Sequence, residues 1–139
     1  MKPAHVVVFA IFFLLSATLL LAMAGDGLWF ARVPDKDRMR HNPFDGNQTA
    51  AAAGAKLFGQ NCASCHGDDA SGRNEHPSLR TDRIRRATPG ELQWLLTNGS
   101  MKKGMPSWSR LPEQQRWQIV SYLKSLQQVD TQMAASSGK

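Results

Sequence analysis

The chain has 139 residues, with 17 Lys and Arg against 11 Asp and Glu and a formal net charge of +6. This length allows one small domain with appendages rather than several domains. Only two cysteines are present, which excludes a zinc site built from four cysteines.

The first predicted element is a hydrophobic helix within residues 1–25. Residues 4–24 form an almost unbroken apolar run, preceded by Lys2. A retained membrane anchor is favoured by the length of the run and by the aromatic residues Trp29 and Phe30 that follow it. A signal peptide cleaved after Ala24 is the alternative, because Ala22-Met23-Ala24 is a small-x-small sequence. Both interpretations predict that the rest of the chain is exported.

Residues 26–48 are predicted to be a linker, because they are polar and charged and contain Pro34, Pro43 and Gly46. The mixed-sign charges of residues 35–40 are expected to be solvated. The folded domain is expected over residues 49–128, and its first helix over about residues 49–61. Gly54 on this helix would allow a close crossing with a later helix.

Cys62-Ala63-Ser64-Cys65-His66 follows the first predicted helix directly. C-x-x-C-H is the attachment sequence for a covalent c-type haem. The two thiols add to the haem vinyl groups, and the adjacent histidine becomes an axial ligand of the iron. A thioredoxin-like pair would need a βαβ setting, and a disulfide between these cysteines would close too small a loop to stabilise much. The sequence therefore predicts one haem c held by Cys62, Cys65 and His66.

A second axial ligand is expected in the stretch Asn98-Gly-Ser-Met-Lys-Lys-Gly-Met-Pro-Ser-Trp108. Haem iron in electron carriers commonly takes a methionine opposite the histidine. Met105 is the favoured candidate among the six methionines. Its neighbour Gly104 lets the backbone approach the macrocycle, and Pro106 stiffens the loop. Met101 is the main competitor, and His76 would give the alternative of bis-histidine ligation.

Two more main helices and no strands are predicted after the haem motif. One begins at Thr88-Pro89-Gly90-Glu91, with a capping-box pattern and proline at the first position, and ends at Gly99. The other covers about residues 112–127 and has apolar residues at helical spacing: Ile119, Val120, Tyr122, Leu123 and Leu126. Residues 129–139 are predicted to be a disordered tail. The predicted fold class is all-α.

Four stretches in this order resemble those of small bacterial class I cytochromes c with one His/Met-ligated haem. They are Gly54-Ala-Lys-Leu-Phe58, the haem motif to Gly67, Gly104-Met105-Pro106, and Ile119-Val-Ser-Tyr-Leu-Lys124. The resemblance implies a cytochrome c fold that wraps the haem, with attachment of the haem on the periplasmic side. It also implies that the Pro77 carbonyl accepts a hydrogen bond from the free ring nitrogen of His66, which would orient the imidazole.

These features predict a mono-haem cytochrome that transfers single electrons between redox partners on the periplasmic side of the inner membrane, rather than an enzyme. The alternative is a fixed haem subunit of a larger oxidoreductase, such as a quinoprotein dehydrogenase or a terminal oxidase. A haem enzyme or gas sensor is a third hypothesis, and it would require Met105 to be labile.

Basic side chains near the proposed site predict an acidic redox partner. Lys102 and Lys103 precede the proposed ligand, and a second cluster consists of Arg80, Arg83, Arg85 and Arg86. A positive rim would steer an acidic partner to the haem edge and make the encounter rate depend on salt. Nucleic acid is not an expected partner, because the domain is exported and carries haem.

Overall fold

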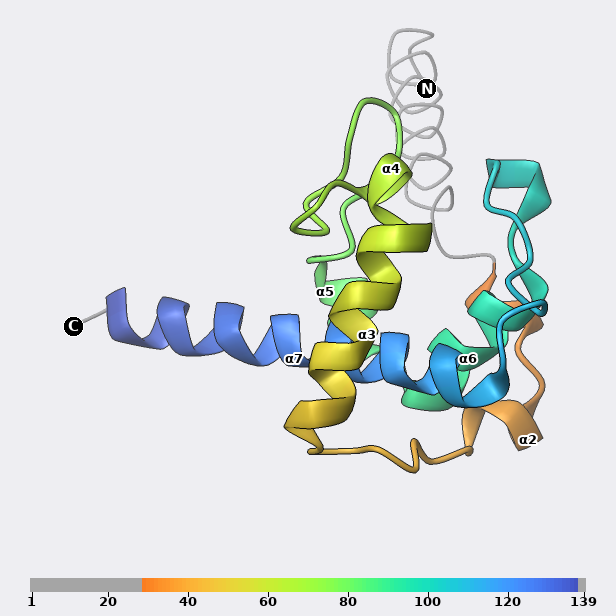
Figure 1. Cartoon of the computed structure of the whole chain (residues 1–139), viewed down its shortest axis with the longest axis horizontal. Helices are drawn as coiled ribbons and strands as arrows, with labels where there is room; N and C mark the ends of the chain where they lie inside the picture. Colours follow the sequence, from red (N-terminus) through yellow and green to blue (C-terminus); the bar gives the residue numbers. More distant parts are fainter. Residues whose placement is uncertain (1–28, 138–139) are drawn as a thin grey trace, which may run out of the picture. The chain divides into compact units, whose positions relative to one another are not determined.

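The structure, a computed structural model, describes residues 29–137 as helices joined by loops (Figure 1). Its longer helices are α3 (Gln48–Asn61), α6 (Pro89–Asn98) and α7 (Glu113–Ser137). Shorter elements are the helices α2 (Asp35–Arg38), α4 (Ala63–His66) and α5 (Asp82–Arg86) and the 3-10 turns η1 (Phe30–Arg32) and η2 (Met101–Lys103). β-Pairing within this range is limited to the isolated bridges Arg73–His76 and Ser100–Met105. The predicted all-α class is confirmed.

The chain divides into two compact units after Arg32, and the unit that begins at Val33 contains all the candidate site residues. The predicted hydrophobic helix of residues 1–25 lies outside the described residues. Within residues 29–137, no helix is both long enough and apolar enough to cross a bilayer.

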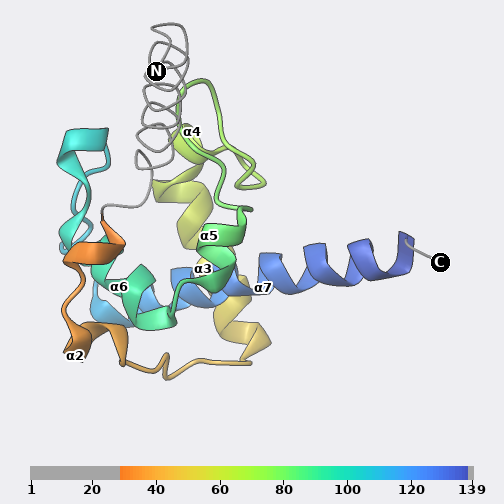
Figure 2. The same ribbon diagram turned by 180° about the vertical axis from the view of Figure 1, so that it is seen from behind.

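The core of the second unit is the crossing of α3 over α7 (Figures 1 and 2). At the crossing point, a Cβ on Gly54 would overlap the backbone carbonyl of Gln118, so only glycine permits this approach. Ile119 of α7 is buried there, and the rings of Phe58 and Tyr122 pack with centroids 5.2 Å apart. The close crossing expected from Gly54 is confirmed.

Helix α6 begins and ends where local sequence signals place its ends. Thr88 Oγ1 accepts a hydrogen bond from the Glu91 amide (3.1 Å), and Glu91 Oε2 accepts one from the Thr88 amide (2.7 Å), which completes the capping box. Gly99 ends the helix with a φ of 69°, a conformation that favours glycine. The predicted start and stop of this helix are confirmed.

The disordered tail predicted for residues 129–139 is wrong for most of its length, since α7 continues as a helix to Ser137. Two long-range contacts hold its second half. Arg80 Nη1 donates to Asp130 Oδ1 (2.5 Å), and Gln127 Nε2 donates to the Leu79 carbonyl (2.8 Å). Neither proline nor glycine occurs in residues 113–137, so nothing in the sequence breaks the helix once these contacts hold it.

The linker predicted for residues 26–48 also needs correction. Residues 33–44 pack on the compact unit, with Val33 and Asn42 buried. Within the charge cluster that was expected to be solvated, Arg38 pairs with the buried carboxylate of Glu91 and Arg40 pairs with Glu113. A buried carboxylate requires such a partner, and this requirement keeps the segment on the protein.

Candidate haem site

Both candidate attachment cysteines lie on one helical turn. Helix α3 ends at Asn61, and α4 carries Cys65 and His66, with Cys62 at its N-terminal cap. Neither thiol is in a disulfide, and Cys62 is buried whereas Cys65 is half-buried. Burial, together with the neighbouring Cys65, raises the pKa of the Cys62 thiol to about 11. The structure therefore holds two free thiols on a single helical turn.

His66 is oriented by the segment that follows it. Its Nδ1 lies 2.9 Å from the Pro77 carbonyl oxygen, which can only accept, so Nδ1 carries the hydrogen and donates. This leaves Nε2 with its lone pair, in the form that binds a metal. The hydrogen bond expected between Pro77 and His66 is confirmed.

Hydrogen bonds hold the loop of residues 67–80, which follows His66, against α4 and α7. The Gly72 amide donates to the His66 carbonyl (2.7 Å), and the Leu79 amide donates to the Ala70 carbonyl (2.8 Å). Arg80 Nε donates to the Asp69 carbonyl (2.7 Å) while its guanidinium also pairs with Asp130 on α7. The Pro77 carbonyl is thus held in place against the helical core. Sequence reasoning missed this role of Arg80, because its partners are distant in sequence.

Met105 lies on the distal loop, which we define as residues 99–112, between α6 and α7. Its backbone is paired on both sides with Ser100: the Met105 amide donates to the Ser100 carbonyl (3.2 Å) and the Ser100 amide donates to the Met105 carbonyl (2.8 Å). Gly104, next to Met105, has a left-handed φ of 76°. Both η2 and α4 lie at the end of the unit opposite α2 (Figures 1 and 2). The structure thus brings the loop of Met105 and the turn of His66 to the same end of the fold.

Hydrogen bonds connect the second half of the distal loop to both α6 and α7. The Trp108 amide donates to the Leu96 carbonyl (2.8 Å), and Ser107 Oγ donates to the Thr97 carbonyl (2.6 Å), both on α6. From α7, the buried Arg116 donates to the carbonyl of Leu111. Sequence reasoning did not single out Arg116, because nothing in Gln115-Arg116-Trp117 signals a side chain that binds loop carbonyls.

The competing ligands differ from Met105 in their surroundings. Met101 is 73% exposed at the tip formed by η2, and Met39 and Met133 are 69% and 64% exposed, whereas Met105 is half-buried. His76 is exposed and forms the small bridge with Arg73. Met105 is therefore less exposed than each of these competing residues.

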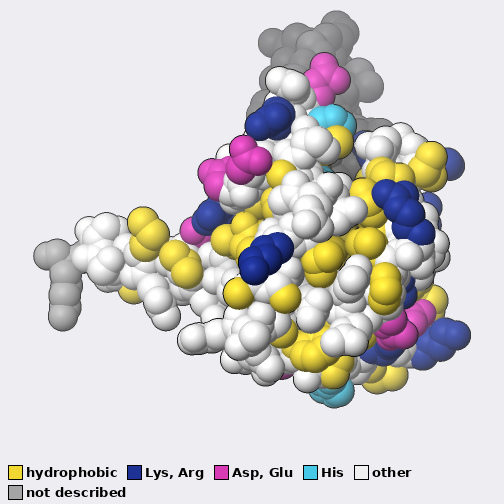
Figure 3. Space-filling model, viewed as in Figure 1, with side chains coloured by type: hydrophobic (Ala, Val, Ile, Leu, Met, Phe, Trp, Pro, Cys, Tyr) yellow, Lys and Arg dark blue, Asp and Glu magenta, His cyan; other side chains and the backbone are white. Residues whose placement is uncertain are grey.

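The residues present fit a covalent haem. Two free thiols, an imidazole with its Nε2 lone pair available and a thioether are the donor set that c-type haem uses. On the face shown in Figure 3, hydrophobic side chains gather near the crossing of α3 and α7, and such a surface suits an apolar macrocycle. Groups of three or more His, Cys, Asp or Glu side chains able to hold a metal ion do not occur within residues 29–137.

The basic residues form two different kinds of surface. Arg80 is paired with Asp130, and Arg85 and Arg86 are both paired with Asp82, so much of the arginine cluster is neutralised. Lys102 and Lys103 are exposed on η2, three and two residues before Met105 in the sequence. The charged residues nearest to Met105 in the sequence are therefore these two lysines.

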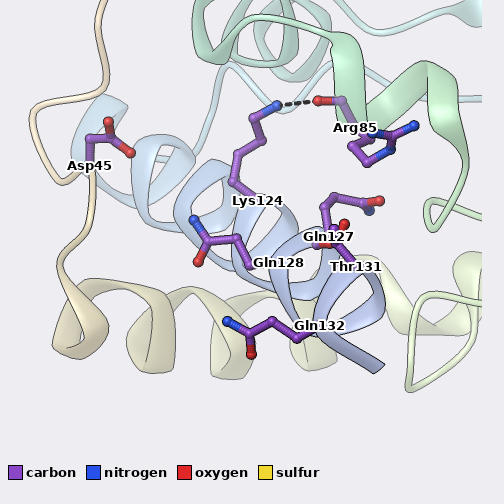
Figure 4. Close-up of a pocket in the computed structure, with 7 residues that line it drawn as sticks. All are labelled: Asp45, Arg85, Lys124, Gln127, Gln128, Thr131 and Gln132. Carbon is purple, nitrogen blue, oxygen red and sulfur yellow. Dashed lines mark hydrogen bonds between the residues drawn. The ribbon is translucent and has the colours of Figure 1, made fainter. Parts of the chain in front are cut away.

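A groove of about 470 Å³ lies elsewhere, along the second half of α7 (Figure 4). Its wall includes Lys124, whose Nζ donates to the Arg85 carbonyl (2.8 Å), together with glutamine side chains of α7. None of the candidate haem residues lines it, so this groove is separate from the candidate haem site.

A helical unit with a C-x-x-C-H motif at the end of a helix, and with the histidine of that motif oriented by a proline carbonyl, is typical of a cytochrome c, a class that carries covalent haem c. Residues 49–123 match the family described as cytochrome c oxidase, cbb3-type, subunit III. The match covers more than half of the chain, and the chain belongs to this family.

Curated relatives are subunits of cbb3-type oxidases. The chain is 39% identical over 92 residues to the cbb3-type cytochrome c oxidase subunit CcoP of Rhodobacter capsulatus, which covers 58% of this chain and 30% of that protein. It is 44% identical over 61 residues to subunit FixP of Bradyrhizobium sp. (42% of this chain, 21% of that protein) and 33% identical over 102 residues to FixP of Sinorhizobium medicae (61% and 33%). The chain therefore spans about a third or less of the length of these relatives.

Proposed function

We propose that this chain holds one haem c covalently through Cys62 and Cys65, with His66 and Met105 as axial ligands, and relays single electrons as a fixed haem subunit of a larger membrane oxidoreductase. The hydrogen bond from His66 Nδ1 to the Pro77 carbonyl is the observation that carries this proposal, because it orients the ring and leaves Nε2 as the ligand atom. Haem, when bound, supplies the one-electron chemistry.

The chain's own residues supply position and enclosure. Cys62 and Cys65 would hold the haem covalently, and the loop of residues 67–80 orients the His66 ring through the Pro77 carbonyl. Met105 would be the second ligand of the haem iron, supplied by a loop that hydrogen bonds tie to α6 and α7. The rigid pair of ligands favours electron transfer over the binding of small molecules.

The main prediction from the sequence is an electron carrier, and a fixed haem subunit is its alternative. Because the relatives are oxidase subunits, they support the fixed subunit more than a freely diffusing carrier. The hydrophobic segment of residues 4–24 would place the unit on the periplasmic side of the inner membrane, as an anchor or as a cleaved signal. We infer that its electron donor or acceptor is a membrane-bound redox protein.

Replacing Met105 with alanine tests the ligand assignment. In Met105→Ala, the iron–thioether charge-transfer band should disappear, the reduction potential should fall, and the ferrous protein should bind carbon monoxide rapidly. Met101→Ala is the matched control and should leave all three unchanged. A band that survives in Met105→Ala and is lost in Met101→Ala would reverse the assignment.

Assembly is tested separately in native membranes extracted with mild detergent. A native gel stained for haem, with mass spectrometry of the stained band, should place the chain in a large band that contains other oxidoreductase subunits. A small band containing this chain alone would instead identify a diffusing carrier.

A further inference from the structure

Residues 33–44, which we name the strap, lie outside the region that matches the family, since that match begins at residue 49. The strap contacts the first turn of α6 through Arg38 and then the first turns of α7 through Arg40 and Asn42. These are the two helices that the distal loop connects. The strap therefore joins the two supports of the Met105 loop.

Its contact with α6 is close and buried. Arg38 Nη1 donates to Glu91 Oε1 (2.5 Å), and Glu91 is only 5% exposed. Thr88 Oγ1 donates to the Arg38 carbonyl (2.8 Å). Gly90 lies beneath the carbonyls of the strap, and a Cβ there would overlap the carbonyl of Asp37. The strap can dock on α6 in this way only because residue 90 has no side chain.

Its contact with α7 uses a cation and an amide. Arg40 donates to Glu113, which holds the pKa of that carboxyl below its usual value, and its guanidinium lies 5.2 Å from the centroid of the Trp117 ring. The buried Asn42 donates through Nδ2 to Ser121 Oγ (2.9 Å) and to the Trp117 carbonyl (3.3 Å). A displaced strap would leave these helix groups without their partners.

We propose that the strap is a brace for the distal axial ligand, in which Arg38 and Arg40 are positioning residues that fix α6 relative to α7. Movement between the two helices would reach Met105, because the loop is fastened to Leu96 on α6 and to Arg116 on α7. The brace keeps Met105 directed at the axial position, and release of the strap loosens it. This inference rests on the proposed role of Met105.

Gly90→Ala tests the brace, because it displaces the strap without weakening α6: alanine is the better helix former. Amide hydrogen exchange of residues 33–44 should accelerate by about tenfold or more in the haem-loaded protein, as overpacking of a close contact favours local opening. Carbon monoxide binding to the ferrous protein should accelerate by a similar factor of about ten. Hydrogen exchange and gas binding should change together because both depend on how often the strap opens. The charge-transfer band should weaken.

Gly59→Ala is the matched control. Gly59 is also a helical glycine, but a Cβ there meets no atom within 4 Å, so exchange, gas binding and spectrum should all stay as in the parent protein. If Gly90→Ala is too unstable to load haem, Arg40→Met removes the contacts with Glu113 and Trp117 and should give the same three changes in milder form.

Two results would overturn the brace. One is fast exchange of the strap in Gly90→Ala with gas binding and the band unchanged, which would make the strap independent of the ligand. The other is unchanged exchange of the strap, which would contradict the close docking on Gly90. Met105→Ala distinguishes failure of the brace from failure of the ligand assignment. If Met105→Ala keeps the charge-transfer band, Met105 is not the ligand, whatever the hydrogen exchange of the strap shows.

Discussion

Gly54 and Gly59 lie on the same helix, α3, and show how differently one residue type can act. Gly54 faces α7, where an added Cβ would overlap the backbone of Gln118, whereas Gly59 faces open space. The haem motif begins three residues after Gly59, at the end of this helix. The crossing permitted by Gly54 therefore positions the candidate residues for haem attachment.

Gly54→Ala should lower the free energy of unfolding by about 2–3 kcal/mol, because backbone atoms cannot yield to the added methyl group. Gly59→Ala should raise it by about 0.5–1 kcal/mol, since the unfolded chain loses freedom and the helix gains a better former. Urea unfolding of the two haem-loaded variants at equal pH measures both. Equal stabilities would show that α3 and α7 do not cross closely at Gly54.

Helix α7 has two parts that do different work. Its first half crosses α3 and forms the core, while its second half holds the loop after the haem motif through Gln127 and Asp130. That loop supplies the Pro77 carbonyl to His66. The C-terminal part of the helix thus supports the proximal side of the site, and the strap supports the distal side.

Asp130→Asn should loosen the proximal loop. Without the ion pair to Arg80, amide exchange in residues 69–80 should accelerate by about threefold to tenfold, as partly buried ion pairs contribute roughly 1 kcal/mol. Asp68→Asn is the control, because Asp68 lies in the same loop but is 89% exposed in its side chain and 3.7 Å from Arg73. Equal exchange in the two variants would mean that Asp130 does not hold this loop.

Local sequence rules predicted the elements whose signals lie within a few residues of one another. The Thr88–Glu91 capping box, the stop at Gly99 and the haem motif are of this kind. The strap and the second half of α7 escaped prediction because their partners are distant: Arg38 and Glu91 are 53 residues apart, and Arg80 and Asp130 are 50 apart. No periodicity or capping pattern reports such pairs. Pro77 could be placed only through the family resemblance.

At the scale of the whole molecule, some basic residues are paired with acidic ones and others lie in a stretch without acidic residues. Residues 92–112, which include the distal loop, contain Lys102, Lys103 and Arg110 but no Asp or Glu, so this stretch of chain carries only positive charge. Around α5, by contrast, Asp82 pairs with Arg85 and Arg86. An acidic partner should therefore be attracted to the distal side more strongly than to α5.

Changing Lys102 and Lys103 together to glutamine should slow electron transfer to a small acidic redox protein by about tenfold at low ionic strength, and the difference should shrink in high salt. Stopped-flow spectroscopy measures the rates, with a small neutral oxidant as a control that should react equally with both proteins. Arg85→Gln with Arg86→Gln should have a smaller effect. A larger effect of the arginines would place the docking surface at α5.

The unequal exposure of the methionines has a chemical consequence under oxidative stress. A thioether becomes a sulfoxide through a sulfur lone pair, so an exposed free thioether reacts and one that coordinates a metal is protected. Dilute peroxide should therefore convert Met39, Met101 and Met133 before Met105, which peptide mass spectrometry can follow while the haem spectrum stays unchanged. Early sulfoxide at Met105 would show that its sulfur is not bound. With Met105 protected, Met101 at the exposed tip would be damaged first, and the haem would keep its ligand.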